Sequence, residues 1–409
     1  MKITILGINY SPEPTGNAPY TASLAEGLVA AGHSVRVITG YPHYPEWQLK
    51  DGYSGWAHDE LMGGVSVKRR RHFIPTAPTA VHRMHMELSF GLRLLFSHWG
   101  KPDVVLLVSP ALFSSAIALL RIRLTPRRPA VGLWIQDLYS LGVVETGTGS
   151  KKLGWLMGKV ESVILRSADG VVVIHDRFRD YIVNTLGVPF EDTRVIRNWT
   201  HLPPSPVSGN KQSRVRLGWA PEDVVVLHAG NMGKKQGLEN VVEAARLAQK
   251  RQSKVKFVLM GDGNQRKRLE GRAEGLTHIQ FIAPLPADEF QQALAAADIL
   301  LVNELPGVKD MAVPSKLTSY FNAGVPVIAA TDGGSVTAME ISASLGGLRV
   351  DAAAPEALLE AAEGLGLDPE AAASLGINGL RFRNEILSEA AAVGDYDDFI
   401  TRLASSHGR

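Results

Sequence analysis

Short apolar segments rich in β-branched residues alternate with longer segments of helical periodicity along almost the whole chain. In the first half, the candidate strands lie at residues 3–8, 35–39, 65–70, 104–108, 131–135, 170–174 and 194–197. A helix is predicted over residues 18–31, with Gly32 as its stop signal. Apolar strands separated by helices are typical of parallel sheets covered on both faces. The alternation therefore predicts an α/β fold.

The alternation is interrupted at residues 201–212, where proline, glycine and polar residues predominate, as in a linker. It then resumes, with candidate strands at residues 224–228, 256–260, 279–282, 299–302, 327–330 and 348–350. We predict two Rossmann-like, doubly wound domains over residues 1–200 and 213–382, joined by a linker over 201–212, and a C-terminal helix over 383–409 that returns to the first domain. Because open parallel sheets bind ligands outside the carboxyl ends of their strands, the domains are expected to face each other across a cleft.

Composition excludes several classes of function. The 409 residues include no cysteine, which excludes disulfides, thiolate metal sites and a cysteine nucleophile. Lysines and arginines number 43 against 41 aspartates and glutamates, so the chain has no overall basic charge for binding nucleic acid. The sequence shows neither a transmembrane segment nor a signal peptide, and we expect a cytoplasmic protein.

The loop at residues 9–20 lies between the first candidate strand and the first helix. Gly16 and Asn17 stand where backbone N–H groups at a helix N-terminus can bind an anion. The dinucleotide fingerprint G-x-G-x-x-G is absent. A proline-rich turn that only caps the helix is an equally good interpretation of this loop alone.

The loop at residues 228–238 has the same place in the second domain and is the strongest indication of an anion site. Its three glycines allow the backbone to approach a ligand closely. Lys234 and Lys235 bring positive charge to a helix start, where lysine is unfavourable unless an anion is bound. The loop lacks the Walker sequence of ATP-hydrolysing proteins. The alternative is a solvated turn with two surface lysines.

A second phosphate-binding segment is predicted at residues 309–318. Pro314 suits the first turn of a helix, where the residues that follow offer free N–H groups and the cation of Lys316. A Gly-Asp-Gly turn at residues 261–263 follows a neighbouring strand. Two phosphate-binding segments along one sheet edge suit a nucleotide diphosphate.

Together, these segments resemble the donor-domain motifs of the GT-B glycosyltransferases of family 4. The resemblance is carried by residues 230–239, 261–263 and 313–327. In the first half, residues 7–16, 37–47 and 53–56 are similar to the colanic acid biosynthesis glycosyltransferases, a fucosyltransferase-like subfamily. The resemblance implies a retaining transfer of a hexose or deoxyhexose from a nucleotide-diphosphate sugar to a saccharide acceptor, without metal or other cofactor.

The resemblance also implies roles for individual residues. Lys235 and Lys316 are the implied catalytic residues, because they would stabilise the leaving diphosphate, and Asp137 is a third candidate. The implied donor-binding residues are Gly16, Asn17, Gly230, Asn231, Lys235, Gly261, Asp262, Ala283, Leu285, Asp310, Ser315, Lys316 and Leu317. The implied acceptor-binding residues, whose rings would stack on sugars unless they only pack a proline-rich loop, are Tyr41, His43, Tyr44 and Trp47.

The sequence departs from the family pattern at several positions. Many members have two glutamates eight positions apart where this chain has Met311 and Ser319, and an arginine where it has Asn231. Gln136 stands beside Asp137 at the position of a frequent histidine. Because Met311 and Ser319 stand in place of the two glutamates, the usual ribose-binding carboxylate is missing from its expected position.

A basic, apolar segment in the first domain indicates a further partner. Residues 68–71 are all cationic, and arginines and histidines alternate with apolar residues over 83–99. This pattern is typical of a surface that contacts anionic lipid or a polyprenyl-diphosphate-linked acceptor. A core helix with a solvated edge is the alternative.

These observations favour a glycosyltransferase that acts in surface polysaccharide synthesis, at the inner face of the cell membrane. Two alternatives stay open. A GT-B nucleotide-sugar epimerase shares the fold but has no acceptor, and a non-enzymatic nucleotide-sugar binding protein is suggested by the missing glutamates.

Overall fold

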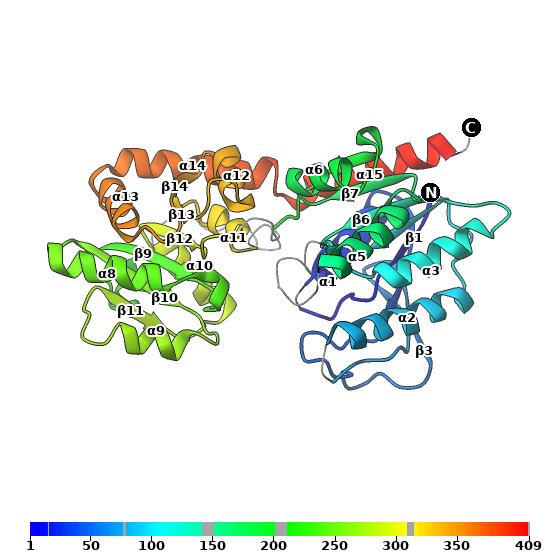
Figure 1. Cartoon of the computed structure of the whole chain (residues 1–409), viewed down its shortest axis with the longest axis horizontal. Coiled ribbons are helices and arrows are strands. Elements are labelled where there is room, and N and C mark those ends of the chain that lie inside the picture. Colours follow the sequence, from blue (N-terminus) through cyan, green and yellow to red (C-terminus); the bar gives the residue numbers. More distant parts are fainter. Residues whose placement is uncertain (15, 77–78, 141–150, 201–210, 309–314, 408–409) are drawn as a thin grey trace. The chain divides into compact units, whose positions relative to one another are not determined.

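Each half of the chain folds into an open, largely parallel sheet covered by helices, which confirms the predicted α/β class. The computed structural model describes all residues except 15, 77–78, 141–150, 201–210, 309–314 and 408–409 (Figure 1). The chain divides into a first unit, Met1–Trp199 with Glu389–Arg409, and a second unit, Thr200–Ser388.

The sheet of the first unit has the strand order β3-β4-β2-β1-β5-β6-β7-β8. Its topological switch point, where strand order reverses, lies between β1 and β5. Only the edge strand β3 was not predicted. It pairs antiparallel with β4, and most of its residues are exposed, so it lacks the apolar run of a buried strand. The strands are β1 (Lys2–Leu6), β2 (Ser34–Gly40), β3 (Ala57–Met62), β4 (Val65–Arg70), β5 (Val104–Val108), β6 (Ala130–Ile135), β7 (Gly170–Val173) and β8 (Thr193–Val195).

Two hydrophobic clusters cover the two faces of this sheet. One joins it to α2, α3, α5 and α6, and the other joins it to α1 and α15. The helices are α1 (Ala18–Ala30), α2 (Ala80–Phe96), α3 (Leu112–Arg123), α5 (Lys151–Leu165), α6 (Asp176–Asn184) and α15 (Glu389–His407), with the 3-10 turn η1 (Phe190–Asp192).

The C-terminal helix α15 packs on β6 and β7 because these strands carry glycine where the helix crosses them. A Cβ on Gly170 would lie 2.9 Å from atoms of both Phe399 and Leu403. The predicted continuous helix over 383–409 is wrong in one respect, since α14 ends at Glu385 and α15 begins at Glu389.

The sheet of the second unit has the order β11-β10-β9-β12-β13-β14, with its switch point between β9 and β12. All neighbouring strands in it are parallel. The strands are β9 (Val224–Ala229), β10 (Val255–Met260), β11 (Ile279–Ile282), β12 (Ile299–Asn303), β13 (Val327–Ala330) and β14 (Gly347–Val350).

The core of the second unit also has two layers. Helices α8 and α13 pack on one face of the sheet, and α10 and α11 pack on the other. The helices are α7 (Lys211–Leu217), α8 (Glu239–Arg251), α9 (Arg266–Arg272), α10 (Ala287–Ala296), α11 (Ser315–Ala323), α12 (Val336–Ser344), α13 (Pro355–Leu367) and α14 (Pro369–Glu385), with the 3-10 turn η2 (Lys234–Gln236). Among the described residues of the whole chain, no helix is long and apolar enough to cross a membrane.

Candidate active site

The predicted glycine loop and the Gly-Asp-Gly turn of the second unit are joined by backbone hydrogen bonds. The N–H of Gly230 donates to the carbonyl of Met260 at 2.8 Å, and the N–H of Met232 donates to the carbonyl of Asp262 at 2.8 Å. Both loops follow parallel strands, β9 and β10, and so lie at the same sheet edge. The structure therefore brings Gly230, Asn231, Gly261 and Asp262 together, next to the switch point where open sheets bind ligands.

Two of these positions require glycine. Gly230 has a φ of +132° and Gly261 a φ of +136°, both in the region that disfavours side chains. A Cβ on Gly261 would lie 1.9 Å from the carbonyl oxygen of Gly230. The close approach of the two loops depends on the absence of side chains here.

Helix α11 brings a cation to the glycine loop. Tyr320 accepts a hydrogen bond from the N–H of Ala229 at 2.9 Å, which fixes the helix against the end of β9. About one turn earlier, the Nζ of Lys316 lies 3.9 Å from the position that a Cβ would take on Gly230. The predicted phosphate-binding residues Gly230 and Lys316 are thus neighbours.

The surroundings of Lys316 disfavour its charge. Burial lowers the pKa of Lys316 to about 8, and the carboxylate of Glu304 acts in the opposite direction. The pKa of the fully buried His228 is lowered well below its usual value by burial and by the charge of Lys316. A bound phosphate would add to the effect of Glu304 and favour the charged form of Lys316.

Sequence reasoning did not find Glu304, which follows β12. Its Oε1 accepts a hydrogen bond from Thr337 at 2.6 Å, and its other oxygen accepts one from Thr331. The next N–H, of Leu305, donates to the carbonyl of Lys235 at 2.8 Å, so this segment also supports η2. The only sequence signal is a charged residue directly after an apolar strand.

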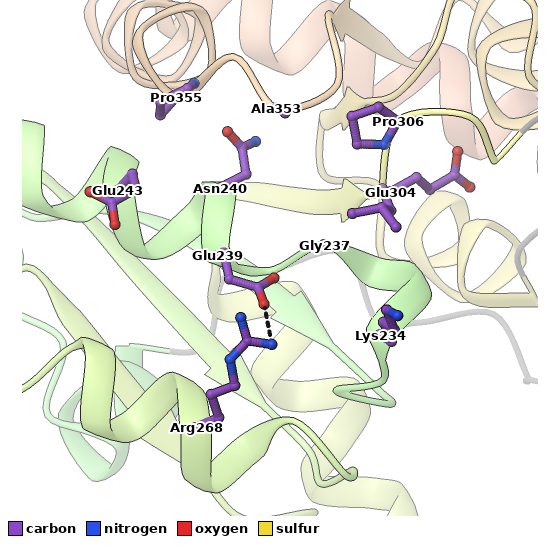
Figure 2. Close-up of a pocket in the computed structure, with 11 residues that line it drawn as sticks. Lys234, Gly237, Glu239, Asn240, Glu243, Arg268, Glu304, Pro306, Ala353 and Pro355 are labelled. Atoms are coloured by element: carbon purple, nitrogen blue, oxygen red, sulfur yellow. Dashed lines mark ion pairs between the residues drawn. The ribbon is translucent and has the colours of Figure 1, made fainter.

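Glu304 and Lys234 line a cavity of about 470 Å³ at this edge of the second unit (Figure 2). Figure 2 shows Arg268 of α9 reaching toward Glu239 at the start of α8, and their ion pair measures 3.1 Å. The cavity is lined by Lys234, Gly237, Glu239, Asn240, Glu243, Arg268, Glu304, Leu305, Pro306, Ala353 and Pro355. Lys235, the neighbouring lysine of η2, is exposed.

The other predicted donor residues differ from one another in location and burial. The N–H of Gly261 donates to the carbonyl of Ile282 at 2.9 Å, so Ala283 follows directly beside the Gly-Asp-Gly turn. Leu285 is partly buried against the core, and the side chain of Leu317 is buried in it. Leu317 can therefore offer a ligand only its main chain. Asp310 and the side chain of Ser315 lie outside the described residues.

In the first unit, three predicted residues meet at the carboxyl ends of β1, β5 and β6. Asn17 precedes α1, and its Nδ2 donates to the carbonyl of Ser109 at 3.1 Å. The hydroxyl of Ser109 donates to the carbonyl of Asp137 at 2.9 Å. Gly16, with a φ of +70°, leaves room for the ring of Tyr44, 3.5 Å from where its Cβ would be. Ser109 therefore links Asn17 to Asp137 by one hydrogen bond to each, and the side chain of Asp137 is exposed.

The proline-rich loop is organised by Glu13, which sequence reasoning also missed. One oxygen of this buried carboxylate accepts the N–H groups of His43 at 2.8 Å and Tyr44 at 2.9 Å. The other accepts the side-chain amide of Asn9 at 2.8 Å. Glu13 thereby ties the loop after β1 to the loop after β2.

Two of the four predicted acceptor residues are buried. Tyr41 donates through its hydroxyl to the carbonyl of Ser54 at 2.8 Å, and His43 contacts the carbonyl of Tyr41 through Nδ1 at 2.9 Å. Their side chains support the loop and are closed to solvent. Tyr44 and Trp47 are partly exposed, with ring centroids 5.7 Å apart and planes at 87°.

The cationic run at residues 68–71 is not the free basic surface that was expected. Lys68 and Arg70 both pair with Asp59 of β3, at 2.6 and 2.9 Å. Arg69 is fully buried and pairs with Glu60 at 2.5 Å. These cations join β4 to the edge strand.

In the part of the chain that the structure describes, no three His, Asp or Glu side chains are grouped as a metal site requires.

Comparisons with known proteins match both halves of the chain. A family described as "Glycosyl transferase 4-like domain" matches residues 15–199, and "Glycosyl transferases group 1" matches residues 210–382. A protein of Escherichia coli K12 described as putative colanic acid biosynthesis glycosyl transferase WcaI is 34% identical over 343 residues, covering 79% of this chain and 82% of that protein. A probable glycosyltransferase of Pseudomonas aeruginosa, WbjE, is 27% identical over 59% of this chain and 60% of its own length.

Solved structures share the arrangement of the fold. Sucrose-phosphate synthase from Thermosynechococcus elongatus has a TM-score of 0.72 at 19% identity, covering 99% of both chains. HepE of Anabaena, solved with UDP-glucose, has a TM-score of 0.65 at 16% identity, covering 99% of this chain and 100% of its own. WaaG, described as a glycosyltransferase involved in lipopolysaccharide biosynthesis, has a TM-score of 0.64 at 16% identity and covers 98% and 99%.

Proposed function

Since this chain belongs to the family 4 glycosyltransferases of GT-B fold, with a 4-like domain followed by a group 1 domain, we propose that it transfers a sugar from a nucleotide-diphosphate sugar to a saccharide of a surface polysaccharide. The observation that carries the proposal is the position of Lys316 beside Gly230. The name of the Escherichia coli relative supports the polysaccharide, and the UDP-glucose complex of HepE supports the donor class.

The second unit is the proposed donor-binding unit. The diphosphate would accept a hydrogen bond from the N–H of Asn231, directly after Gly230, and meet the charge of Lys316, with Lys235 on the same loop. The base would lie toward Asp262 and Ala283, beside the Gly-Asp-Gly turn. The carboxylate of Glu304 is available for sugar or ribose hydroxyls, in place of the glutamates missing at Met311 and Ser319.

The proposed reaction retains the anomeric configuration and needs no metal. The bond from the anomeric carbon to the diphosphate oxygen breaks, and a bond to the acceptor hydroxyl oxygen forms on the same face. The acceptor proton passes to the oxygen of the leaving diphosphate, so the products are a nucleoside diphosphate and the lengthened saccharide. Lys316 and Lys235 would favour the transition state by stabilising the charge on the leaving diphosphate. Within the first unit, Gly16, Asn17 and Asp137 are further proposed site residues.

A lipid-linked acceptor is supported by an unusual face of α2. Five apolar residues of this helix, spaced three or four apart, point to solvent and form what we call the α2 stripe: Val81, Met84, Leu88, Leu92 and Phe96. Phe96 is 89% exposed and Val81 is 67% exposed. A continuous apolar face of this kind is uncommon on a water-exposed helix.

Cations and an exposed tryptophan accompany the α2 stripe. Trp56 is 69% exposed, and its ring lies 4.5 Å from the guanidinium of Arg93 and 6.0 Å from that of Arg71. Apolar side chains with neighbouring arginines and tryptophan suit the surface of an anionic bilayer. We therefore propose that α2 rests on the inner face of the membrane, where a polyprenyl-diphosphate-linked saccharide would be found.

The function is tested by incubating the purified protein with UDP-, GDP- and dTDP-sugars, with and without a lipid extract of bacterial membranes. A glycosyltransferase releases nucleoside diphosphate only with the extract and yields a glycolipid whose anomeric configuration, read by NMR, matches that of the donor. An epimerase would change the donor without the extract, and a binding protein would release nothing. Either result would overturn the proposal.

A further inference from the structure

Arg83 of α2 lies over the indole ring of Trp47, with its guanidinium carbon 5.3 Å from the ring centroid. Arg83 is exposed, and its charge acts on the buried carboxyl of Glu87, one helical turn later, to lower the pKa of that group. Among the described residues, no ion pair joins Arg83 to a carboxylate. An arginine over an aromatic ring keeps its hydrogen-bond donors directed outward. The charge of Arg83 is therefore available for an anion.

The aromatic residues beside Arg83 form a rigid corner. The rings of Tyr44 and Trp47 are nearly perpendicular and 5.7 Å apart, and both are partly exposed. The N–H of Tyr44 is held by the buried carboxylate of Glu13, as is the N–H of His43, whose ring lies 5.8 Å from that of Trp47. The corner is thus fixed from beneath by hydrogen bonds that water does not reach.

The same stretch of α2 carries the start of the α2 stripe. Val81 and Met84 flank Arg83 in sequence and are both exposed. Residues one or two positions apart on a helix point in different directions, so Arg83 and the α2 stripe lie on different sides of α2. Arg83 adjoins the aromatic corner through Trp47, and the loop of the corner contacts Gly16 through Tyr44. A sugar ring and a diphosphate are directly linked in a polyprenyl-diphosphate-linked saccharide, which matches an aromatic corner beside a cation, and the same helix carries an apolar stripe for a lipid chain.

We propose that Tyr44, Trp47 and Arg83 bind the head of a lipid-linked acceptor, with its first sugar against the two rings and its diphosphate on Arg83. This inference rests on the proposed function. Glu13 is a positioning residue of the site, because it holds the loop of Tyr44 and Trp47 without reaching the ligand. Sugar rings pack on aromatic faces through their C–H groups, and arginine binds phosphate through paired N–H groups.

The site is tested with geranyl diphosphate, a short soluble prenyl diphosphate, titrated calorimetrically into full-length protein. The nucleoside diphosphate that binds best is present at saturation, so that the second unit is already occupied. We expect Arg83→Gln to weaken geranyl diphosphate binding at least tenfold, and Arg166→Gln, an exposed arginine beyond α5, to leave it unchanged. Geranyl monophosphate should bind the wild type more weakly.

Equal binding of geranyl diphosphate to wild type and Arg83→Gln would overturn the site, even where the nucleoside diphosphate binds normally. If Arg83→Gln instead binds geranyl diphosphate like wild type and loses only its binding to vesicles of phosphatidylglycerol, Arg83 serves the bilayer alone, and the site is likewise overturned. If no nucleoside diphosphate binds, the proposed function fails separately, and the Arg83 comparison can still be made without it.

The role of Glu13 is tested by Glu13→Gln, which keeps the size of the side chain but replaces one acceptor oxygen by a donor. A positioning role predicts a higher KM for the lipid-linked acceptor, about tenfold or more, with donor KM and the thermal shift caused by nucleotide unchanged. An equal loss for both substrates would indicate general damage and contradict this role. Trp47→Ala, which leaves the Glu13 bonds in place, should reproduce the acceptor defect.

Discussion

The Nζ of Lys316 lies 3.9 Å from the position that a Cβ would take on Gly230. This relationship joins the first turn of α11 to the loop after β9 and places a cation against a backbone that only glycine can adopt. Two loops that are separately compatible with ordinary surface turns are thereby combined into one anion site.

The contact between the two glycine loops should be intolerant of any side chain. Gly261→Ala would bring a Cβ to within 1.9 Å of the carbonyl oxygen of Gly230, at a φ of +136°. We expect a loss of about 2–4 kcal/mol in the free energy of unfolding. Nucleotide binding should be lost as well. Urea unfolding measures the change.

Gly271→Ala is the matched control for Gly261→Ala. Gly271 lies in α9, and nothing stands within 4 Å of its Cβ position. Alanine in a helix interior is favoured over glycine by about 0.5–1 kcal/mol, so this variant should be as stable as wild type or more so. Equal effects of the two substitutions would contradict the proposed packing of the loops.

Nucleotide affinity should depend on pH through Lys316. Burial lowers the pKa of this lysine to about 8, so it is charged below that pH in the empty site and loses its charge as the pH rises through it. Affinity for a nucleoside diphosphate should therefore fall between pH 7.5 and 9.5, measured by calorimetry. In Lys316→Met the affinity should be low and nearly flat over the same range. A wild-type profile without a decline would show that this charge does not bind the ligand.

Glu87 of α2 makes the stability of the first unit depend on pH. Burial raises the pKa of its carboxyl from 4.5 to about 7, while its oxygens accept hydrogen bonds from Tyr139 and from the N–H of Phe113. The folded state holds this proton between pH 4.5 and 7 and the unfolded state does not, so the contribution to stability is lost as the pH rises through 7.

Glu87→Gln should therefore reduce the fall in melting temperature between pH 5 and pH 8. At pH 8 the variant should be more stable than wild type by about 1–3 kcal/mol. The glutamine oxygen can still accept from Phe113, and its amide can donate to the hydroxyl of Tyr139, which itself can donate to the carbonyl of Pro110 at 3.1 Å. A variant with the same pH dependence as wild type would exclude Glu87 as the titrating group.

The α2 stripe should govern binding to membranes. Leu88→Asp with Leu92→Asp places two charges in the stripe, and we expect at least a tenfold loss of binding to vesicles of phosphatidylglycerol, measured by sedimentation. Leu367→Asp, at an 86% exposed position at the end of α13, is the control and should bind as wild type. Equal binding of all three proteins would remove the proposed membrane contact. Arg69 is unsuitable for the same test, because its side chain is buried and paired with Glu60.

The strands of both sheets could be predicted because a buried parallel strand is apolar along its whole length. β4, β5, β11 and β13 have the predicted bounds, and the other predicted strands differ at their ends. Strand β3 was missed because it lies at an edge with most residues in water, and its identity depends on the pairing of Asp59 and Glu60 with β4. That pairing is a tertiary contact, which no local pattern contains.

Part of the candidate site could also be predicted from the sequence. Glycines between a strand and a helix, with lysine nearby, indicated the loop at Gly230 and the helix of Lys316. The carboxylates of Glu13 and Glu304 were missed because their roles depend on partners far away in sequence, such as His43 and Thr337. The sequence leaves Tyr41 and His43 open between contact with a sugar and packing of the loop, because an aromatic residue in a loop looks the same in sequence whether it faces water or the core. The structure buries both side chains.

Nucleoside diphosphate binding by wild type and Lys316→Met tests the central claim most directly. The measurement is the melting temperature with and without 1 mM UDP, GDP or dTDP, because a ligand that binds the native state raises it. We predict that at least one of these nucleotides raises the melting temperature of wild type by several degrees and leaves Lys316→Met unchanged. Without ligand, Lys316→Met should melt higher than wild type, because a buried charge has been removed. No shift for wild type, or the same shift for both proteins, would contradict a diphosphate site at Lys316 and Gly230.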